Sequence, residues 1–316
     1  LSAVSGVVSS TSGSSITTNG TYNSYSSGVD WDQRAGNISI SAMGVNIAST
    51  ISATSRNVNG GNYNGDISIT TTSTSVDGSN VGIGGVISGR AFTKAGVGIL
   101  KLSGNNGWNT TTLISGGTLQ LGTGTTGTNT AGNIPDGSAL TMGNGSVLDM
   151  NASSEKMGSL ASASGYGRVT SSVSGTYTLT TGNDNGPTTY TGMLEDGVLG
   201  ALLNLTKIGS GRFTLSTSAN TYDGLTSVSA GILEIQHSSS LGVADGTTGA
   251  GTVVTNGATL YVNNGISVGN ELLTINGVGD AGSLRSTSGT NVWGGSIVQG
   301  MASTIYIDGG SLTLNP

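Results

Sequence analysis

Gly231-Ile232-Leu233-Glu234-Ile235 places two large apolar residues, Leu233 and Ile235, two positions apart just after a glycine. Residues spaced by two point to the same face of a β-strand, and a glycine permits the turn that precedes it. The pattern recurs at residues 98–102, 117–121, 145–150, 211–215 and 310–314. One such strand buries too little to be stable alone, so many copies must stack.

This pattern predicts an all-β fold, a single parallel β-solenoid in which equivalent apolar residues of successive coils lie on one another. We expect about 15 coils at ~4.8 Å each, a rod of roughly 70 Å. The expected core is Leu100, Leu102, Leu119, Leu121, Leu148, Met150, Phe213, Leu215, Leu233, Ile235, Leu260, Val262, Leu312 and Leu314.

The composition suits such a stack. Of 316 residues, 56 are Gly, 3 are Pro, none is Cys and 8% are charged. Like charges repel when they repeat in register, and proline cannot donate to a sheet ladder. A disordered Gly-rich linker is disfavoured by the alternation and by 34% hydrophobic residues.

The net charge and the hydropathy of the chain limit which classes of binding partner we expect. The net charge of −6 predicts no nucleic-acid partner, because no basic patch neutralises phosphates. The most apolar stretch, residues 198–205, is too short to cross a bilayer, so we expect no membrane insertion of this segment. Leu1 is not an initiator Met and no basic stretch precedes an apolar core, so no secretion signal is visible in these residues, and we expect the chain to be a processed or trimmed piece.

The short pattern lies inside a longer duplication. Residues 92–103 align with residues 205–216 through the shared order Thr-Lys-x-Gly-x-Gly, and an aromatic residue follows each, Trp108 and Tyr222. We expect repeat blocks at about 85–191 and 192–294, a partial block at 295–316, and divergent solenoid or a cap over residues 1–80. The repeat solenoid as a whole then spans residues 81–316.

The duplicated segment resembles the autotransporter-associated β-strand repeat of bacterial surface and secreted proteins. The resemblance rests on residues 205–216, 219–224 and 228–235, with a weaker copy at 92–121. It implies a right-handed parallel β-helix exported by a Gram-negative bacterium. The repeat implies an architecture and a location, not an activity.

Clustered acids are the main candidates for chemistry, because polysaccharide-cleaving β-helix enzymes use them. Asp30 and Asp32 would share a face of an extended strand, with Arg34 nearby and Trp31 opposite. Glu195 and Asp196 are adjacent and would point to opposite faces. We favour a polar loop at residues 30–34, and a paired-carboxylate or calcium site there is the alternative.

Other candidate residues have structural explanations. His237, the only histidine, follows a strand in a polar turn. The segments 183–186 and 60–66 are Asn-Gly turns or, alternatively, calcium loops. Trp108, Tyr222 and Trp293 fit internal packing at coil corners better than stacking on sugars. No catalytic, cofactor-binding or metal residue is assigned.

The expected function is therefore a non-enzymatic extracellular stalk, adhesin or filament subunit. Its partners would be further copies added end to end, or a glycan or a host or neighbouring cell surface. A carbohydrate-active β-helix enzyme, resembling a polysaccharide lyase or hydrolase, is the alternative.

Overall fold

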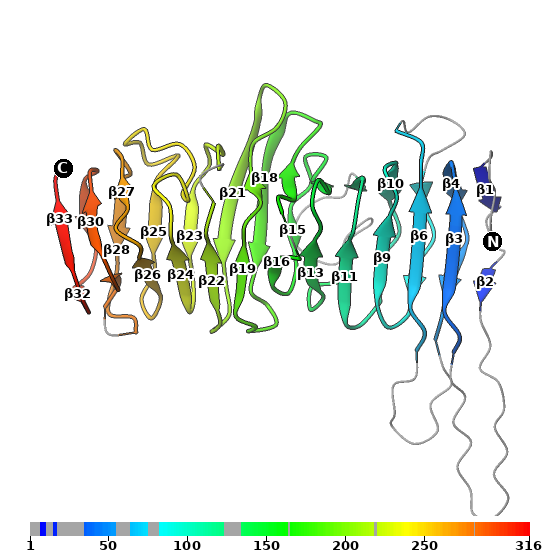
Figure 1. The fold of residues 1–316 in the computed structure, drawn as a ribbon, viewed down its shortest axis with the longest axis horizontal. Coiled ribbons are helices and arrows are strands. Elements are labelled where there is room, and N and C mark those ends of the chain that lie inside the picture. Colours follow the sequence, from blue (N-terminus) through cyan, green and yellow to red (C-terminus); the bar gives the residue numbers. More distant parts are fainter. Residues whose placement is uncertain are drawn as a thin grey trace, which may run out of the picture.

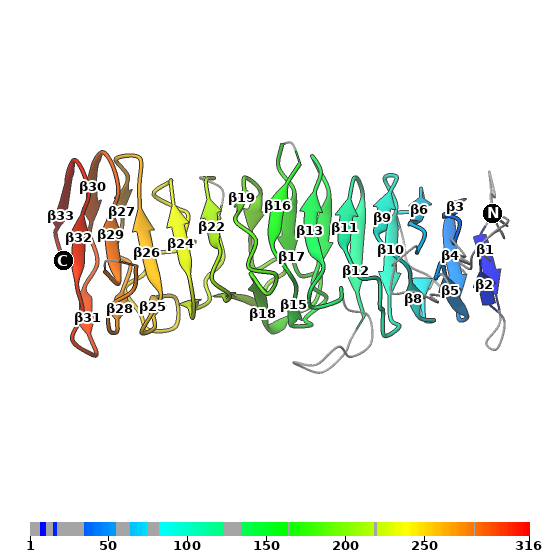
Figure 2. The same cartoon turned by 90° about the horizontal axis from the view of Figure 1, so that it is seen from below.

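The computed structural model describes residues 7–10, 15–17, 35–54, 64–74, 82–122, 134–163, 165–217, 220–280 and 282–316. Their strands lie side by side in one long row, from the N-terminus at one end to the C-terminus at the other (Figures 1 and 2). Neighbouring strands in the row are parallel, and no helix occurs in these ranges. The predicted all-β parallel solenoid is confirmed.

Each coil passes over up to three faces, called here the first, second and third in chain order. The first face has two ladders of six strands, which adjoin where β16 contacts β19. These strands are β3 (Ile38–Ala42), β6 (Ile67–Thr71), β9 (Phe92–Ala95), β11 (Thr111–Ile114), β13 (Ala139–Met142), β16 (Leu160–Ser162), then β19 (Thr188–Tyr190), β22 (Arg212–Leu215), β24 (Ile232–Ile235), β26 (Thr259–Val262), β29 (Leu284–Ser286) and β32 (Ile305–Ile307).

The second face has a ladder of eight strands followed, nearer the C-terminus, by a ladder of three. The eight are β1 (Val7–Ser10), β4 (Gly44–Ile47), β7 (Gly82–Ile83), β10 (Ile99–Leu102), β12 (Thr118–Leu121), β14 (Val147–Asp149), β17 (Arg168–Thr170) and β20 (Met193–Leu194), and the three are β27 (Ser267–Val268), β30 (Thr290–Trp293) and β33 (Ser311–Leu314).

The third face has a ladder of three strands and then one of seven. The three are β2 (Ser15–Thr17), β5 (Thr50–Ser52) and β8 (Ile87–Ser88), and the seven are β15 (Glu155–Lys156), β18 (Gly175–Thr181), β21 (Ala201–Lys207), β23 (Thr226–Val228), β25 (Thr252–Val254), β28 (Leu273–Ile275) and β31 (Ile297–Gln299).

The expected core is confirmed except at its C-terminal end. Leu100, Leu119 and Leu148 are register partners on successive strands and are fully buried. Leu312 is only partly buried and Leu314 is 46% exposed, against expectation. Both lie on β33, which pairs with β30 on one side and has no partner strand on its other side among the described residues.

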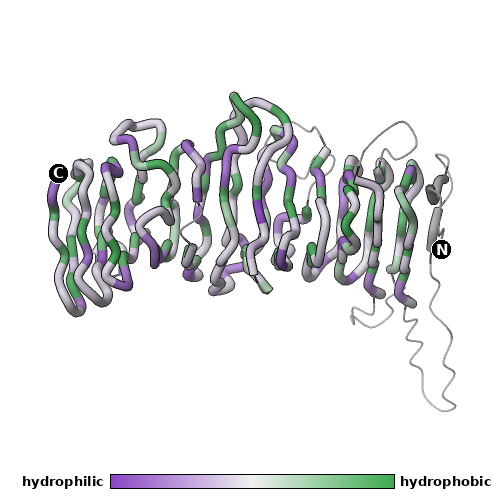
Figure 3. The backbone as a smooth tube through the Cα atoms, turned by 45° about the horizontal axis from the view of Figure 1, so that its top comes forward, coloured by the Kyte–Doolittle hydropathy of each residue, from purple (hydrophilic) through white to green (hydrophobic). Residues whose placement is uncertain are grey.

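The expected number of coils was too high. The first face, which has a strand in nearly every coil, carries two ladders of six strands, fewer than the 15 coils expected. At ~4.8 Å per strand, that row spans roughly 55 Å. The difference arises because many coils take more residues than the strands alone require, in loops between faces. Figure 3 shows apolar segments recurring from coil to coil along the whole row.

The two copies of the long repeat occupy different faces. In the copy at 92–121, strands β9 to β12 alternate between the first and second faces. In the copy at 205–235, the equivalent strands β21 to β24 alternate between the third and first faces. The second copy is therefore rotated by one face around the solenoid axis relative to the first.

Candidate functional site

Two buried lysines occupy equivalent corners of the repeat copies. Lys94 takes an inward position between Ile69 and Ile114, and its ammonium donates to the carbonyl oxygens of Ala95, Gly96 and Gly116 at 2.8, 3.0 and 3.1 Å. Three donors meet three acceptors, so the charged group is fully hydrogen-bonded.

Lys207 repeats this arrangement. Its Nζ donates to the carbonyl oxygens of Ile208, Gly209 and Ala230 at 2.6, 2.9 and 3.2 Å. Burial lowers the pKa of both lysines to about 8, which leaves them mostly charged at neutral pH. The Lys-x-Gly part of the repeat thus supplies donors to backbone oxygens where the chain changes face.

The glycine in this motif has a steric reason. Gly96 and Gly209 have φ angles of 75° and 70°. A Cβ atom on Gly209 would lie 2.0 Å from the carbonyl oxygen of Gly182 in the preceding coil, and one on Gly96 would lie 2.4 Å from that of Thr71. Only glycine combines this conformation with so close an approach between coils.

A buried asparagine and an aromatic residue fill the side of each repeat coil that lacks a strand. Asn106 accepts from the backbone N–H of Ile87 at 3.1 Å, and Asn220 accepts from that of Leu194 at 2.9 Å. In this way each asparagine side chain pairs with a strand of the preceding coil.

The aromatic residues are internal, as expected from the sequence. Trp108, Tyr222 and Trp293 are all fully buried. Trp108 stacks on Phe92 with ring centroids 4.6 Å apart and donates to Thr112 Oγ1 at 2.8 Å. Tyr222 forms the matching hydrogen bond with Thr226, also four residues on, at 2.7 Å. These rings are not available to stack on a ligand.

Two glutamates point into the solenoid. Burial raises the pKa of Glu155 well above its usual range, with a further contribution from Asp136. Burial also raises the pKa of Glu271 to about 8, although Thr252 donates to its Oε1 at 2.7 Å. Both carboxyl groups are enclosed among core residues, so they affect stability rather than surface chemistry.

A groove of about 400 Å³ lies on the outside of the second face. Its floor is a column of register partners on β10, β12, β14 and β17: Ile99, Thr118, Val147 and Arg168. Its other lining residues are Gln120, Asp149, Thr170, Ser171, Ser172, Glu195, Gly197 and Val198. Polar and apolar side chains therefore alternate along the groove.

Asp149 is fixed as part of the groove's framework. It is only 4% exposed. Its Oδ1 accepts from the N–H groups of Asn151 and Ser172, both at 2.9 Å, and its Oδ2 accepts from Gln120 Nε2 at 2.8 Å and Ser172 Oγ at 2.6 Å. A carboxylate offers about four acceptor positions. All four are used, so Asp149 has no lone pair left for a general-base role.

The groove's side wall is the segment that follows β20. Glu195 Oε1 lies 3.2 Å from Arg168 Nη1. Gly197 has φ of 99°, and a Cβ there would lie 2.1 Å from the carbonyl oxygen of Ser171. The wall then projects outward to Leu199, which is 100% exposed, before β21 begins. The β18 and β21 region extends beyond the neighbouring coils in Figure 1.

Glu195 and Asp196 diverge, as the sequence predicts. Asp196 turns away from Glu195, and its carboxylate accepts from the backbone N–H groups of Leu203 at 2.7 Å and of Asp223. Burial raises the pKa of Asp196 in spite of these bonds. The two carboxylates are therefore held by different parts of the chain, Glu195 by Arg168 and Asp196 by the backbone of Leu203 and Asp223.

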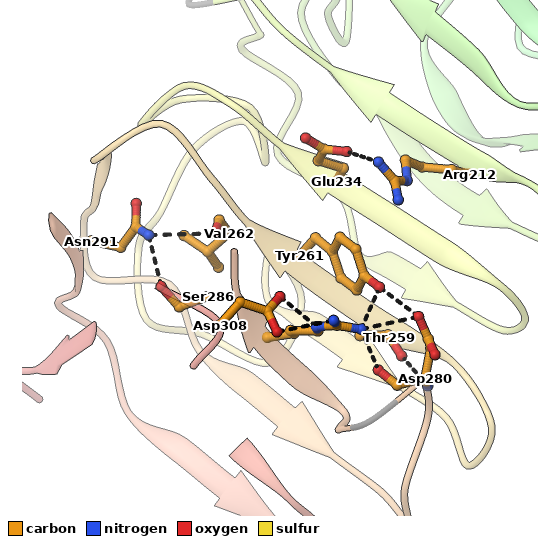
Figure 4. Close-up of polar contacts among 10 residues, drawn as sticks. Arg212, Glu234, Thr259, Tyr261, Val262, Asp280, Ser286, Asn291 and Asp308 are labelled. Atoms are coloured by element: carbon orange, nitrogen blue, oxygen red, sulfur yellow. Dashed lines mark hydrogen bonds and ion pairs between the residues drawn. The ribbon is translucent and has the colours of Figure 1, made fainter. Parts of the chain in front are cut away.

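The outside of the first face carries a stack of charged and aromatic side chains (Figure 4). Arg212 and Arg285 lie over Tyr261 at 5.2 and 5.1 Å from its ring centroid. Arg212 pairs with Glu234 at 3.1 Å, and Arg285 pairs with Asp308 at 2.7 Å. Each arginine of this stack is therefore paired with a carboxylate. A second groove, of about 390 Å³, lies beside Arg212 and Glu234.

The other candidate residues have these positions. Asp30, Trp31, Asp32 and Arg34 lie outside the described residues, as does most of segment 60–66. His237 is exposed in a turn, where its Nδ1 accepts from Ser239 N–H at 3.4 Å.

The acids of the two candidate calcium loops have protein partners. Asp184 accepts from Ser159 Oγ at 2.8 Å and from Gly186 N–H at 3.0 Å. Asp66 accepts from Arg90 Nε at 2.8 Å. In the described ranges no group of three or more His, Cys, Asp or Glu side chains is arranged to hold a metal.

The sequence did not reveal the groove. Asp149, Arg168 and Glu195 are 19 and 27 residues apart with no shared motif, and they meet because β14, β17 and β20 stack in register. The only sequence signal was polar residues at outward positions of predicted strands, which describes most of this chain.

Searching the described residues for a helix long and apolar enough to cross a membrane finds none. Residues 92–121 and 205–235 match the model of the passenger-associated-transport-repeat family. No curated protein and no solved structure matches the chain. The repeats and the β-solenoid together fit a passenger-type surface protein of the autotransporter kind.

Proposed function

We propose that this chain is a non-enzymatic structural or adhesive shaft, carried outside the cell by a Gram-negative bacterium. The observation that supports this most is the presence of two passenger-type repeats inside one continuous solenoid. An adhesin or stalk needs a long, stiff body with variable outer side chains, and a stacked parallel coil provides both.

The interior supports the same role. The lysine, asparagine and aromatic hydrogen bonds described above satisfy each repeat coil's polar groups internally or through the adjacent coils. Coils built this way can be added without a new domain boundary.

Cell-surface labelling tests the location. An epitope tag inserted at Gly145, in an exposed turn, should be labelled by antibody on intact cells that carry the gene, while a periplasmic control protein stays unlabelled. Labelling only after the outer membrane is permeabilised would contradict the proposal. Loss of attachment on deletion of the gene would then separate an adhesive role from a purely structural one.

The alternative is a carbohydrate-active β-helix enzyme that works from the Asp30–Arg34 region or from another acidic face. A screen of acidic and neutral polysaccharides with the purified chain tests it directly. Products that disappear in Asp30→Asn and Asp32→Asn would establish the enzyme and overturn the non-enzymatic proposal.

We further propose that these 316 residues associate end to end through the coil formed by β31, β32 and β33. Ile305, Ile307 and Leu314 are 37%, 47% and 46% exposed although they occupy inward register positions. Uncovered strands with apolar inward residues readily accept another strand.

In a preparation of these 316 residues alone, a strand that pairs with the uncovered edge of β33 can come only from another molecule. Sedimentation should show concentration-dependent association that Leu314→Lys abolishes. Val97→Lys, at an exposed position between β9 and β10 and far from β33 along the row, should leave association unchanged. Monomers at all concentrations would remove this version of the proposal.

A further inference from the structure

We propose that the groove on the second face binds a neutral, linear polysaccharide lying along the solenoid axis. The inference deepens the adhesive role proposed above and rests on it, since it names the ligand that an adhesive shaft of this kind would hold. It follows from the groove's length, its charge balance and the kind of hydrogen-bonding groups on its floor.

The groove's length favours an extended ligand. Ile99, Thr118, Val147 and Arg168 are partners in one register column across four successive strands. Three intervals of ~4.8 Å give a floor of roughly 14 Å along the axis. A chain molecule fits this shape better than a compact metabolite does.

The groove's charges favour a neutral ligand. The guanidinium of Arg168 is already paired with Glu195, and Asp149 has its four acceptor positions filled. An acidic polysaccharide would meet these two carboxylates, and a cationic one would compete with the paired Arg168. A ligand without charge avoids both costs.

The floor's hydrogen-bonding groups favour a sugar over a peptide. The backbone N–H and C=O groups of β10, β12, β14 and β17 are already used in the parallel ladder, so no open strand edge is offered to an extended peptide. What remains are side chains: the hydroxyl of Thr118, the oxygen of Ser172, which can still accept although its proton goes to Asp149, and the exposed part of Arg168. Between them stand Ile99, Val147 and Val198, which match the apolar C–H faces of sugar rings.

Affinity electrophoresis of the purified 316-residue chain tests this inference. Separate gels contain pullulan, hydroxyethyl cellulose, lichenan or galactomannan as neutral polymers, alginate or polygalacturonate as acidic ones, and gelatin as a polypeptide. We expect retardation in at least one neutral gel and none in the acidic or gelatin gels. Retardation by acidic polymers or gelatin alone, or by nothing, would overturn the inference.

Three variants locate the site. Thr118→Arg places a long charged side chain in the middle of the floor and should abolish retardation. Arg168→Met should raise the dissociation constant about tenfold, the effect of losing one charge-assisted hydrogen bond. Arg212→Met is the matched control, because it removes an equally exposed arginine paired with a glutamate, Glu234, on the first face. It should bind as the unaltered chain does.

Unchanged binding by a folded Thr118→Arg or Arg168→Met variant would also overturn the inference. Circular dichroism melting of each variant excludes unfolding as the cause of a loss. This assay needs no cell, so its failure is distinct from failure of the surface labelling that tests the proposed function. If the chain is exposed on the cell surface but binds no neutral polymer, the proposed shaft function stands and the proposed role of the groove is wrong.

Discussion

In the repeat copy at 92–121 the lysine corner joins the first face to the second, whereas at 205–235 the equivalent corner joins the third face to the first. The aromatic side that lacks a strand is displaced in the same way, from the third face to the second. Yet both copies keep the three lysine bonds, the asparagine bond to the preceding coil and the bond from the aromatic residue to the threonine four positions on. The motif therefore specifies a local corner and its packing, and the face on which it lies depends on how many strands and loops come before it.

The largest test of this equivalence replaces the inward phenylalanines. Phe213→Asp and Phe92→Asp each put a carboxylate among fully buried side chains. Each should lower the free energy of unfolding by more than about 4 kcal/mol, measured by urea denaturation. Thr189→Asp, at an exposed position of β19, is the control and should have little effect. An unchanged melting curve for Phe213→Asp would be incompatible with the solenoid core described here.

The lysine corners give the second largest effect. Lys207→Met and Lys94→Met would each leave three carbonyl oxygens without a donor, at a cost of about 2–4 kcal/mol. If the corner is a local device, the two costs should agree within about 1 kcal/mol. Lys156→Met removes an exposed lysine paired with Asp136 and should cost about 1 kcal/mol or less. Equal stability of all three variants would show that the corner bonds contribute nothing.

Much of this fold could be predicted from residues alone. Leu100, Leu119, Phe213 and Leu233 were expected in the core because spacing by two fixes which side of a strand they share. The buried Trp108 was also expected, because an aromatic residue recurs at the same place in both copies.

The rotation between copies and the groove could not be predicted. The pattern of a glycine followed by two apolar residues two positions apart is the same on every face, so it carries no information about which face a strand joins. The contact between Arg168 and Glu195 depends on the lengths of the loops between coils, which vary. Glu271 had no signal, because a single glutamate looks the same in sequence whether it points inward or outward.

Glu271, which lies C-terminal to the second repeat copy, should make the stability of the chain depend on pH. Its carboxyl lies beside Thr252 and Asp245, and burial raises its pKa from 4.5 to about 8. The folded chain holds the Glu271 proton more tightly than the unfolded chain does, so the protonated carboxyl contributes to the free energy of unfolding. This stabilisation is fully present below about pH 4.5 and is lost as pH rises toward 8. The slope is at most about 1.4 kcal/mol per pH unit.

Glu271→Gln should flatten stability between pH 5 and 8 in urea titrations. Glu234→Gln is the control, because Glu234 is held by Arg212, Gln236 and Asn263 at the outer face. A pH profile that is the same for Glu271→Gln and the unaltered chain would show that Glu271 does not govern this range.

The smallest test concerns the aromatic corners, where the two copies differ in chemistry. Tyr222→Phe removes the hydrogen bond to Thr226 and should cost about 1 kcal/mol, because Thr226 Oγ1 then loses its partner in a fully buried position. Thr226→Val in the Tyr222→Phe background should recover part of that loss, since neither hydroxyl is then left unpaired.

In the first copy, Thr112 keeps a hydrogen bond with Ser138 at 2.9 Å after Trp108→Phe, so the cost there is lost ring volume rather than an unpaired hydroxyl. Thr112→Val should therefore fail to rescue Trp108→Phe, and equal rescue in both copies would contradict this distinction.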